Sequence, residues 1–230
     1  MLFLKSQRAK PITNTNLTKM KKLLLSVLVS INFLYLSAQS STHFSNNYND
    51  SYSSGNSFIH YVGEIYGGGV IFEVHKSQNG REHGLIVSLS DQSTEQVWSN
   101  VDSVSIGYSA QSEWDGYQNT RSIIRQRNHN ISAANICFNF CDGGFHDWYL
   151  PSVNEMGLLL EVKFKVNWTL HSIAGATEMN GENPYNSFWT STESDSEHAW
   201  MVEFYLGNPA PYFSWTLKNT AGRVRAIRAF

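Results

Sequence analysis

The chain has 230 residues, of which 41% are hydrophobic, 13% aromatic and 16% charged. This composition excludes a disordered or coiled-coil protein, and 16 glycines with only five prolines exclude a collagen-like chain. Six of the 17 basic residues, but none of the 19 acidic ones, precede residue 39. The remainder carries eleven basic against 19 acidic residues, a net charge of −8, and this balance argues against nucleic acid as a partner.

The amino terminus has the pattern of an export signal. From Met20 the sequence runs Met-Lys-Lys, and an apolar stretch then ends at Ala38. A basic start, an apolar core and a final small residue are typical of a secretory signal peptide. The apolar stretch has about 16 residues, whereas a membrane-spanning helix needs roughly 20, so an uncleaved anchor is the weaker alternative. We expect a signal peptide over 1–38, with Met20 as a second candidate start.

Cleavage after this signal would leave a periplasmic, secreted or surface-exposed protein with no transmembrane segment. Residues 39–57 are rich in Ser and Asn and show no apolar period, which predicts a solvated linker. The folded domain is then expected over 58–230, a length that suits one domain.

Three short β-type runs come first, at 61–65, 70–74 and 84–89. Gly67–Gly69 and Asn79-Gly80 separate them and favour turns, so the pattern predicts a small antiparallel sheet. The middle of the chain is predicted to be helical. One helix is expected to begin at Asn119-Thr120 and a second to span 131–140.

A third helix is expected after Ser152, with Glu155 completing a capping box and Phe164 on the same helix. Four β-type segments follow, at 188–191, 199–206, 212–217 and 223–230. The order of strands, helices and strands predicts an α+β fold in which the first and last strands meet.

Several blocks of the sequence, taken in order, carry a family resemblance. They are VGEIYGGGVIFEV, HGLIVSLSDQST, GGFHDWYLPSVNEM, FWTSTE and the terminal RVRAIRAF. Over about residues 61–230 the chain resembles the domain formerly called DUF1566, also known as the Legionella collagen-like protein carboxy-terminal domain. This domain is common in exported proteins of Bacteroidetes and other bacteria. The resemblance implies a C-type-lectin-like fold of small antiparallel sheets, with two or three helices in the middle of the chain.

The resemblance also implies which residues are framework and where a ligand would bind. Family members present a ligand surface on a rigid scaffold, usually for adhesion, and the variable positions of diversified relatives lie between the TSTE-like and RVRA-like blocks. The residues expected to be structural are Asp147, Trp148, Pro151, Trp189, Trp200, Arg223, Arg225 and Arg228. For Asp147 and Trp148 we expect a buried turn in which the carboxylate and the indole N–H are both hydrogen-bonded.

The predicted ligand surface is the stretch 193–219, which is rich in aromatic and amide side chains. Such side chains are typical of adaptable binding surfaces, although strand alternation would place about half of these aromatics in the core. The expected contacts are Tyr205, Asn208, Tyr212, Trp215 and Asn219.

Charged residues near this stretch leave two readings open. Glu193, Asp195 and Glu197 have oxygen-rich spacing that could hold calcium, but the pattern favours a solvated acidic loop. The three terminal arginines could bind an anion, or could pair with internal carboxylates such as Glu155 or Glu193 and fix the last strand. We expect the pairing and no cofactor, with calcium as the one alternative left open.

Cys137 and Cys141 are the only cysteines, and in an exported protein they could form a strained disulfide across one helical turn. A metal or copper site like that of formylglycine-generating enzymes is disfavoured because no histidine pattern accompanies them. No G-x-S-x-G motif supports a hydrolase triad with His146 and Asp147.

Together these patterns predict a non-enzymatic, exported domain that binds an extracellular protein or glycan. The alternatives are a structural envelope component, in which case the protein could be an oligomer, and an enzyme with a buried site in the same fold.

Overall fold

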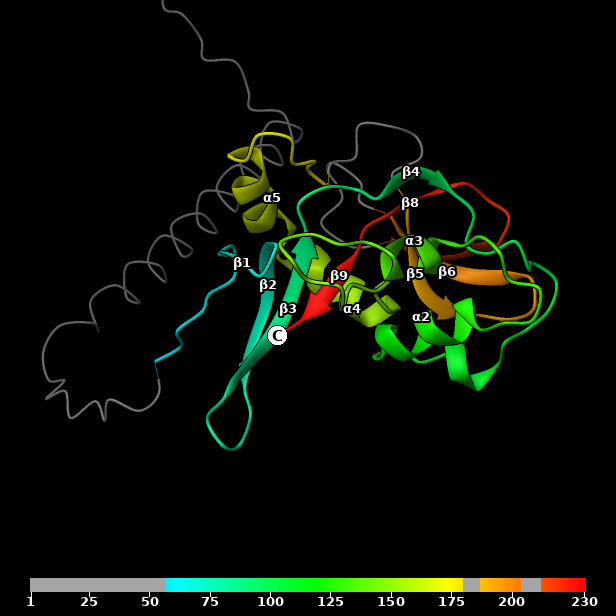
Figure 1. Cartoon of the computed structure of the whole chain (residues 1–230), viewed down its shortest axis with the longest axis horizontal. Coiled ribbons are helices and arrows are strands. Elements are labelled where there is room, and N and C mark those ends of the chain that lie inside the picture. The colour runs from blue at the N-terminus through cyan, green and yellow to red at the C-terminus, as the bar shows by residue number, and fades with distance from the viewer. Residues whose placement is uncertain (1–56, 180–186, 204–211) are drawn as a thin grey trace, which may run out of the picture. The chain divides into compact units, whose positions relative to one another are not determined.

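The computed structural model describes residues 57–179, 187–203 and 212–230 (Figure 1). Within them the first sheet has the order β1–β2–β3–β9, formed by Ile65–Tyr66, Gly69–Lys76, Glu82–Ser88 and Ile227–Ala229. Every pairing in it is antiparallel. The last strand, red in Figure 1, lies beside β3, with Leu85 opposite Ala229. The last strand thus joins the sheet of the first strands, as expected, but the predicted meeting of the first and last strands is wrong, because β9 pairs with β3 and lies at the opposite end of the sheet order from β1.

The turn between β1 and β2 depends on glycine. Gly67 and Gly68 have φ of 57° and 85°, a region that side chains rarely adopt. At the start of β2, a Cβ on Gly69 would lie 2.1 Å from the carbonyl oxygen of Val87. The glycine cluster thus allows a tight reversal and a close approach of strands, and its role is structural.

The second sheet has the order β4–β8–β5–β6–β7, formed by Ser93–Gln96, Gly222–Val224, Ser187–Glu193, His198–Glu203 and Tyr212–Leu217. Only the β5–β8 pairing within it is parallel. The predicted single strand at 223–230 is wrong, because its two halves join different sheets. β8 pairs with β4 and β5, whereas β9 pairs with β3.

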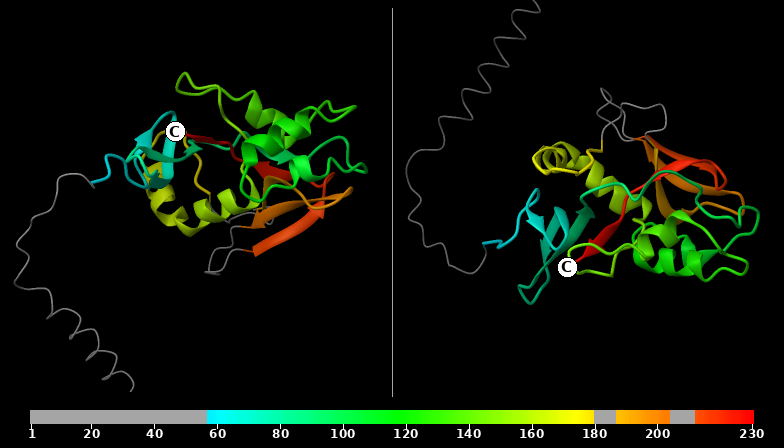
Figure 2. Two further views of the ribbon diagram at one scale, coloured as in Figure 1. Left: turned by 90° about the horizontal axis from the view of Figure 1, so that it is seen from below. Right: turned by 45° about the horizontal axis from the view of Figure 1, so that its top comes forward.

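The helices are α2 (Gly116–Ile124), α3 (Ala133–Phe138), α4 (Val153–Glu161) and α5 (Lys163–His171), preceded by the short 3-10 helix η1 (Tyr108–Ala110). In both views of Figure 2 the green helices α2 and α3 and the yellow-green α4 and α5 form two groups, and the start of α2 contacts α4 where Gly116 donates to Glu155. The described chain is therefore α+β, as predicted.

Helix boundaries follow local capping, and one of them was predicted correctly. Ser152 and Glu155 form the expected capping box at α4. The predicted start of the first helix is wrong, because Asp115 caps α2 from Gly116 onward and Asn119 lies inside the helix. The helix predicted to reach Phe164 ends at Glu161, and Phe164 projects from α5 as an exposed side chain.

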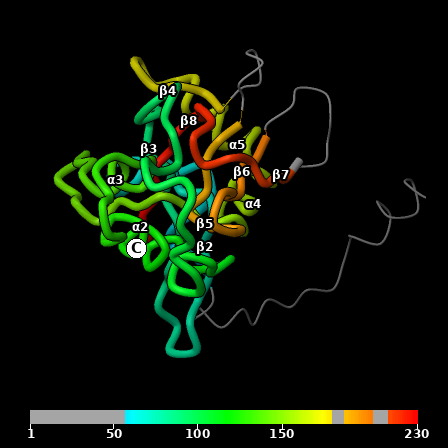
Figure 3. The backbone as a smooth tube through the Cα atoms, turned by 90° about the vertical axis from the view of Figure 1, so that its right-hand side faces the viewer, coloured from blue at the N-terminus to red at the C-terminus, as the bar shows by residue number. Residues whose placement is uncertain are grey.

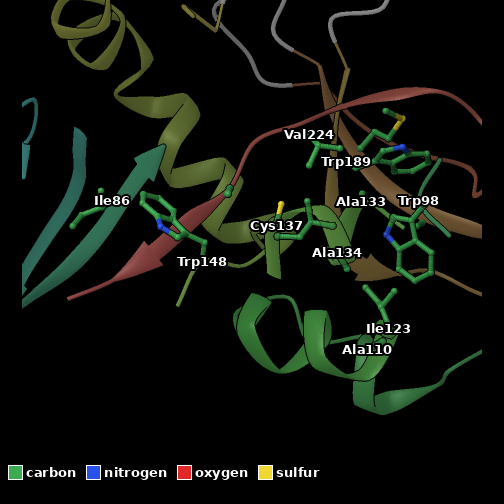
Figure 4. Close-up of a cluster of buried hydrophobic side chains, with 14 of the residues drawn as sticks. Ile86, Trp98, Ala110, Ile123, Ala133, Ala134, Cys137, Trp148, Trp189 and Val224 are labelled. Atoms are coloured by element: carbon green, nitrogen blue, oxygen red, sulfur yellow. The ribbon is translucent and has the colours of Figure 1, made fainter. Parts of the chain in front are cut away.

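Two clusters of buried hydrophobic side chains form the core. One surrounds Trp98, Trp148 and Trp189, all fully buried, and receives small residues of α3 such as Ala134 (Figure 4). The other packs α4 and α5 against the sheets, with Leu159 and Phe188 among its members. Three of the chain's seven tryptophans thus fill the first cluster.

Candidate functional site

The strands β6 and β7 carry an exposed aromatic face. Their antiparallel register places Trp200 opposite Trp215 and His198 opposite Leu217. The two indole rings meet edge to face, with centroids 5.9 Å apart. Trp215 is 64% exposed and Leu217 is 47% exposed. Figure 3 shows β7 at the end of the sheet, next to β6. The half-buried Trp200 thus packs against the exposed Trp215 on this face.

Alternation along β6 fixes which side chains reach this face. Ala199 and Met201 are buried in the tryptophan-rich core cluster, whereas Trp200 between them is only half-buried. On β7, Phe213 packs against the second core cluster. Phe213 lies two residues from Trp215 and so on the same face of β7. The second core cluster, which includes Leu159 of α4, covers this face at Phe213 but leaves Trp215 exposed.

A buried ion pair lies at the ends of β5 and β7. Lys218 Nζ donates to Glu193 Oε1 at 2.8 Å, and both side chains are fully buried. Glu193 also accepts hydrogen bonds from the backbone N–H groups of Ile106 and Gly107, at 2.9 and 2.8 Å. The pair fixes the loop before η1 to the end of the aromatic face. It was missed in the sequence, because nothing local distinguishes Lys218 from a surface lysine.

The pair also bears on the calcium prediction. The Glu193 carboxylate faces Lys218 and is buried, while Asp195 and Glu197 are exposed. Asp195 Oδ1 accepts the N–H groups of Glu197 and His198, both at 2.8 Å, and these bonds lower the pKa of its carboxyl. Over 57–179, 187–203 and 212–230, no group of three His, Cys, Asp or Glu side chains is arranged to hold a metal ion. The structure does not bring the three predicted ligands together.

The other predicted contacts have different outcomes. Asn219 is exposed beyond β7 and donates to Asp102 Oδ2 at 3.2 Å. Tyr212 begins β7, but its side chain is outside the described part of the chain. Tyr205 and Asn208 lie outside the described residues. Trp215 is thus the predicted contact whose exposure the structure describes most fully.

The terminal arginines form ion pairs, although with carboxylates other than those expected. Arg223 Nε and Arg225 Nη1 both donate to Asp91, at 2.8 and 2.7 Å. Burial lowers the pKa of the Arg225 guanidinium to about 10, and Asp91 opposes that shift. Arg228 Nε donates to Asp147 at 2.7 Å. The expected pairing with Glu155 or Glu193 is wrong.

Glu155 is satisfied elsewhere. Its carboxylate accepts from the N–H groups of Ser152 and Gly116 and from the hydroxyl of Tyr149, at 2.7, 3.1 and 2.9 Å. Burial raises the pKa of its carboxyl, against the effect of these donors. The group therefore joins α2, α4 and the preceding loop.

The turn before α4 differs from its prediction in two details. Trp148 is fully buried, as expected, but its indole N–H has no hydrogen-bond partner in the described structure. The Asp147 side chain is half-exposed, and its hydrogen bonds with Arg228 lower the pKa of its carboxyl. The Pro151 carbonyl accepts the N–H of Ser191 at 2.7 Å. Trp189 Nε1 donates to the Gln96 carbonyl at 2.8 Å.

Both cysteines are free thiols, so the possible disulfide is not formed. Cys137 points into the core from α3, and burial raises the pKa of its thiol. Cys141 lies beyond the helix and is exposed, with Sγ 3.6 Å from His146 Nε2. The two thiols face different surroundings because α3 ends at Phe138.

A pocket of about 460 Å³ was also missed in the sequence. It lies between the β2–β3 hairpin, the loop before α2 and the helix α4, and Trp114 is one of its walls. His75 and His83 face one another across the hairpin, with ring centroids 5.7 Å apart. Their equal spacing from Asn79 was the signal that could have placed them opposite one another.

Comparison with known proteins identifies the family. No helix in the described part of the chain is both long and apolar enough to cross a membrane. A search of curated proteins found no match. A similar solved structure is a fimbrial protein from Bacteroides ovatus ATCC 8483, with 16% identity and a TM-score of 0.49, covering 67% of this chain and 37% of that one. The chain thus spans a little over a third of that protein's length. The family model "Lcl C-terminal domain" matches residues 88–228, and the protein therefore belongs to the Lcl C-terminal domain family.

Proposed function

We propose that this protein is an exported, non-enzymatic domain that binds an extracellular protein or glycan through the β6–β7 face. The observation that carries the proposal is Trp215, which is 64% exposed beside Trp200 although the core already holds three buried tryptophans. Keeping an indole and the neighbouring Leu217 in water costs free energy that a bound partner would recover. Tryptophan is also among the residues most enriched at binding hot spots.

The rigidity of the face supports the same proposal. Six consecutive residue pairs align β6 with β7, and the buried Lys218–Glu193 pair holds the end of β7. A preorganised side chain loses little conformational entropy on binding, so more of its contact energy contributes to affinity. We infer a C-type-lectin-like arrangement from the family and from the pairing of β9 with β3, which brings the two ends of the domain together.

The buried titratable groups support binding over catalysis. Glu193 is paired with Lys218, and Glu155 accepts three hydrogen bonds from its own framework. An enzyme needs such groups to converge on a substrate with unused hydrogen-bonding capacity. In the described structure these groups instead hold loops and helix starts in place.

The test is a binding screen of the purified protein against glycan and extracellular-protein arrays, with and without calcium. We expect a ligand whose binding falls about thirtyfold with Trp215→Ala, as for a hot-spot residue worth roughly 2 kcal/mol. Tyr212→Ala, alone and combined with Trp215→Ala, would test the predicted contact at the start of β7. Trp168→Ala is the matched control, because Trp168 is 84% exposed on α5. Equal loss with both tryptophan variants would contradict a site on β6–β7, and calcium dependence would restore Asp195 and Glu197 as candidate ligands.

A second candidate function is self-assembly in the envelope, and the sheet order favours it. In the described part of the chain β7 has one neighbouring strand, β6, and so lies at a sheet edge. Its sequence YFSWTL contains neither lysine nor proline, the residues that usually protect such an edge. Light scattering separates the two candidates: a concentration-dependent dimer abolished by Thr216→Pro would support assembly, and a monomer at all concentrations would exclude it.

A further inference from the structure

The pocket beside Trp114 is separate from the β6–β7 face and is lined by side chains of several elements. Its volume of about 460 Å³ lies within the range of small-ligand sites. Strand residues Glu73, His75 and His83 form one side, Trp114 and Glu155 the other, and Leu158 contributes from α4. Side chains from three separated parts of the sequence therefore converge on one cavity.

A bulge orients the hairpin side of the pocket. The register of β2 against β3 shifts between Ile71 and Glu73, so that Glu73 lies opposite Leu85 and His75 opposite His83. Such bulges re-aim side chains, and they occur frequently beside functional sites. Glu73 Oε1 lies 2.9 Å from His75 Nδ1, and the two imidazole rings stack across the strands. The bulge thus places one carboxylate and two imidazoles on the pocket side.

The loop that carries Trp114 is held from several directions. The Ser112 carbonyl accepts from Asn119 Nδ2 at 2.6 Å and from Thr192 Oγ1 at 3.0 Å. The Glu113 carbonyl accepts the N–H of Asn154 at 3.1 Å. Trp114 itself remains 65% exposed. An exposed indole on a fixed loop is preorganised to form the wall of a binding site, since little freedom is lost when a ligand packs on it.

The charges in the pocket indicate the ligand. Its described lining contains the carboxylates of Glu73 and Glu155, and it contains no lysine or arginine. An indole face attracts a cation, and a carboxylate forms a charge-assisted hydrogen bond with one. We propose that this pocket binds one cationic side chain, arginine or lysine, of an extracellular peptide or protein. The cation packs on Trp114, and Glu73 accepts its hydrogen bonds in place of His75.

The probe is the blocked peptide acetyl-Gly-Arg-Gly-amide, with a lysine counterpart and with a citrulline counterpart that keeps the arginine shape without its charge. Binding to the purified full chain is followed by the indole N–H signal of Trp114 in a two-dimensional NMR spectrum, assigned by its disappearance in Trp114→Phe. A single side chain should bind with a dissociation constant of about 1 mM. The citrulline peptide should bind at least tenfold more weakly, because the charge-assisted bond is lost.

Two variants and two controls complete the test. Glu73→Gln should raise the dissociation constant about tenfold, and Trp114→Ala, followed by another shifted resonance, should raise it roughly fivefold. Trp168→Ala and Trp215→Ala should leave peptide binding unchanged, so failure here stays distinct from failure at the β6–β7 face. Circular dichroism confirms that each variant is folded. The proposal is overturned if citrulline binds as well as arginine, if folded Glu73→Gln binds normally, if nothing shifts at about 10 mM peptide, or if only neutral sugars shift the Trp114 signal.

Discussion

The buried Lys218–Glu193 pair gives the most quantitative prediction about stability. In Lys218→Met the apolar part of the side chain remains, but Glu193 loses the Nζ that lies 2.8 Å from its carboxylate. Removing one partner of a buried ion pair costs about 3–5 kcal/mol, because the other charge is left without compensation. Ser105, Ile106 and Gly107 still donate hydrogen bonds to Glu193. We therefore expect the lower end of that range, about 3 kcal/mol.

Urea unfolding of the purified chain measures this loss against a total stability of about 5–15 kcal/mol for a protein of this kind. Glu193→Gln should also destabilise the folded protein. The double variant with Lys218→Met should lose at least 1 kcal/mol less stability than the sum of the losses of the two single variants. Glu178→Gln is the control, because its partner His171 is largely exposed and such pairs contribute about 0–1 kcal/mol. Strict additivity, or a loss below about 1 kcal/mol for Lys218→Met, would refute the reasoning.

Three further predictions concern single side chains. In urea unfolding, Trp98→Phe should destabilise the folded protein by about 1 kcal/mol more than Trp148→Phe. The reason is that Trp98 donates to the Thr190 carbonyl at 2.8 Å, whereas the Trp148 indole N–H has no partner in the described structure. Equal losses of stability would contradict this. A thiol reagent should label Cys141 in the folded protein and Cys137 only after unfolding, since Cys137 is buried. Mass spectrometry of the digested protein distinguishes the two labelled cysteines. A disulfide between them in the purified protein would contradict this prediction. Hydrogen bonds from Arg228 lower the folded-state pKa of Asp147, so its contribution to stability is present above the unfolded pKa of about 3.9 and is lost as the pH falls through the lower folded value. Asp147→Asn should therefore cost about 1 kcal/mol or less at pH 7 and flatten the stability profile below pH 4, and an unchanged acid profile would contradict the assignment.

Features that depend on a few neighbouring residues could be predicted from the sequence. The capping box at Ser152 was found because both of its partners lie within one helical turn. The hairpin at Asn79-Gly80 was found because turn residues flanked by β-type runs have a strong local preference. The order of elements gave the α+β class, and the sequence blocks gave the family.

Partners distant in the sequence could not be predicted in this way. The carboxylates that pair with the terminal arginines lie 132 and 81 residues from Arg223 and Arg228, and many acidic residues were equally compatible with the pattern. The division of the last segment between two sheets depends on which strands are available as neighbours, and a strand pattern does not encode this.

The candidate sites show the same limit. Aromatic composition marked the stretch around Trp215. Strand alternation places Phe213 and Trp215 on the same face, and only the packing of α4 residues such as Leu159 decides that Phe213 is covered while Trp215 is exposed. The pocket at Trp114 needs a bulge, a fixed loop and a helix to converge, and each lies in a different part of the chain. The free energies of forming a helix cap or a tight turn are set by neighbouring residues, so these features can be predicted from short sequence patterns. The burial of a charge and the shape of a pocket arise from long-range packing, which exists only once the chain has folded.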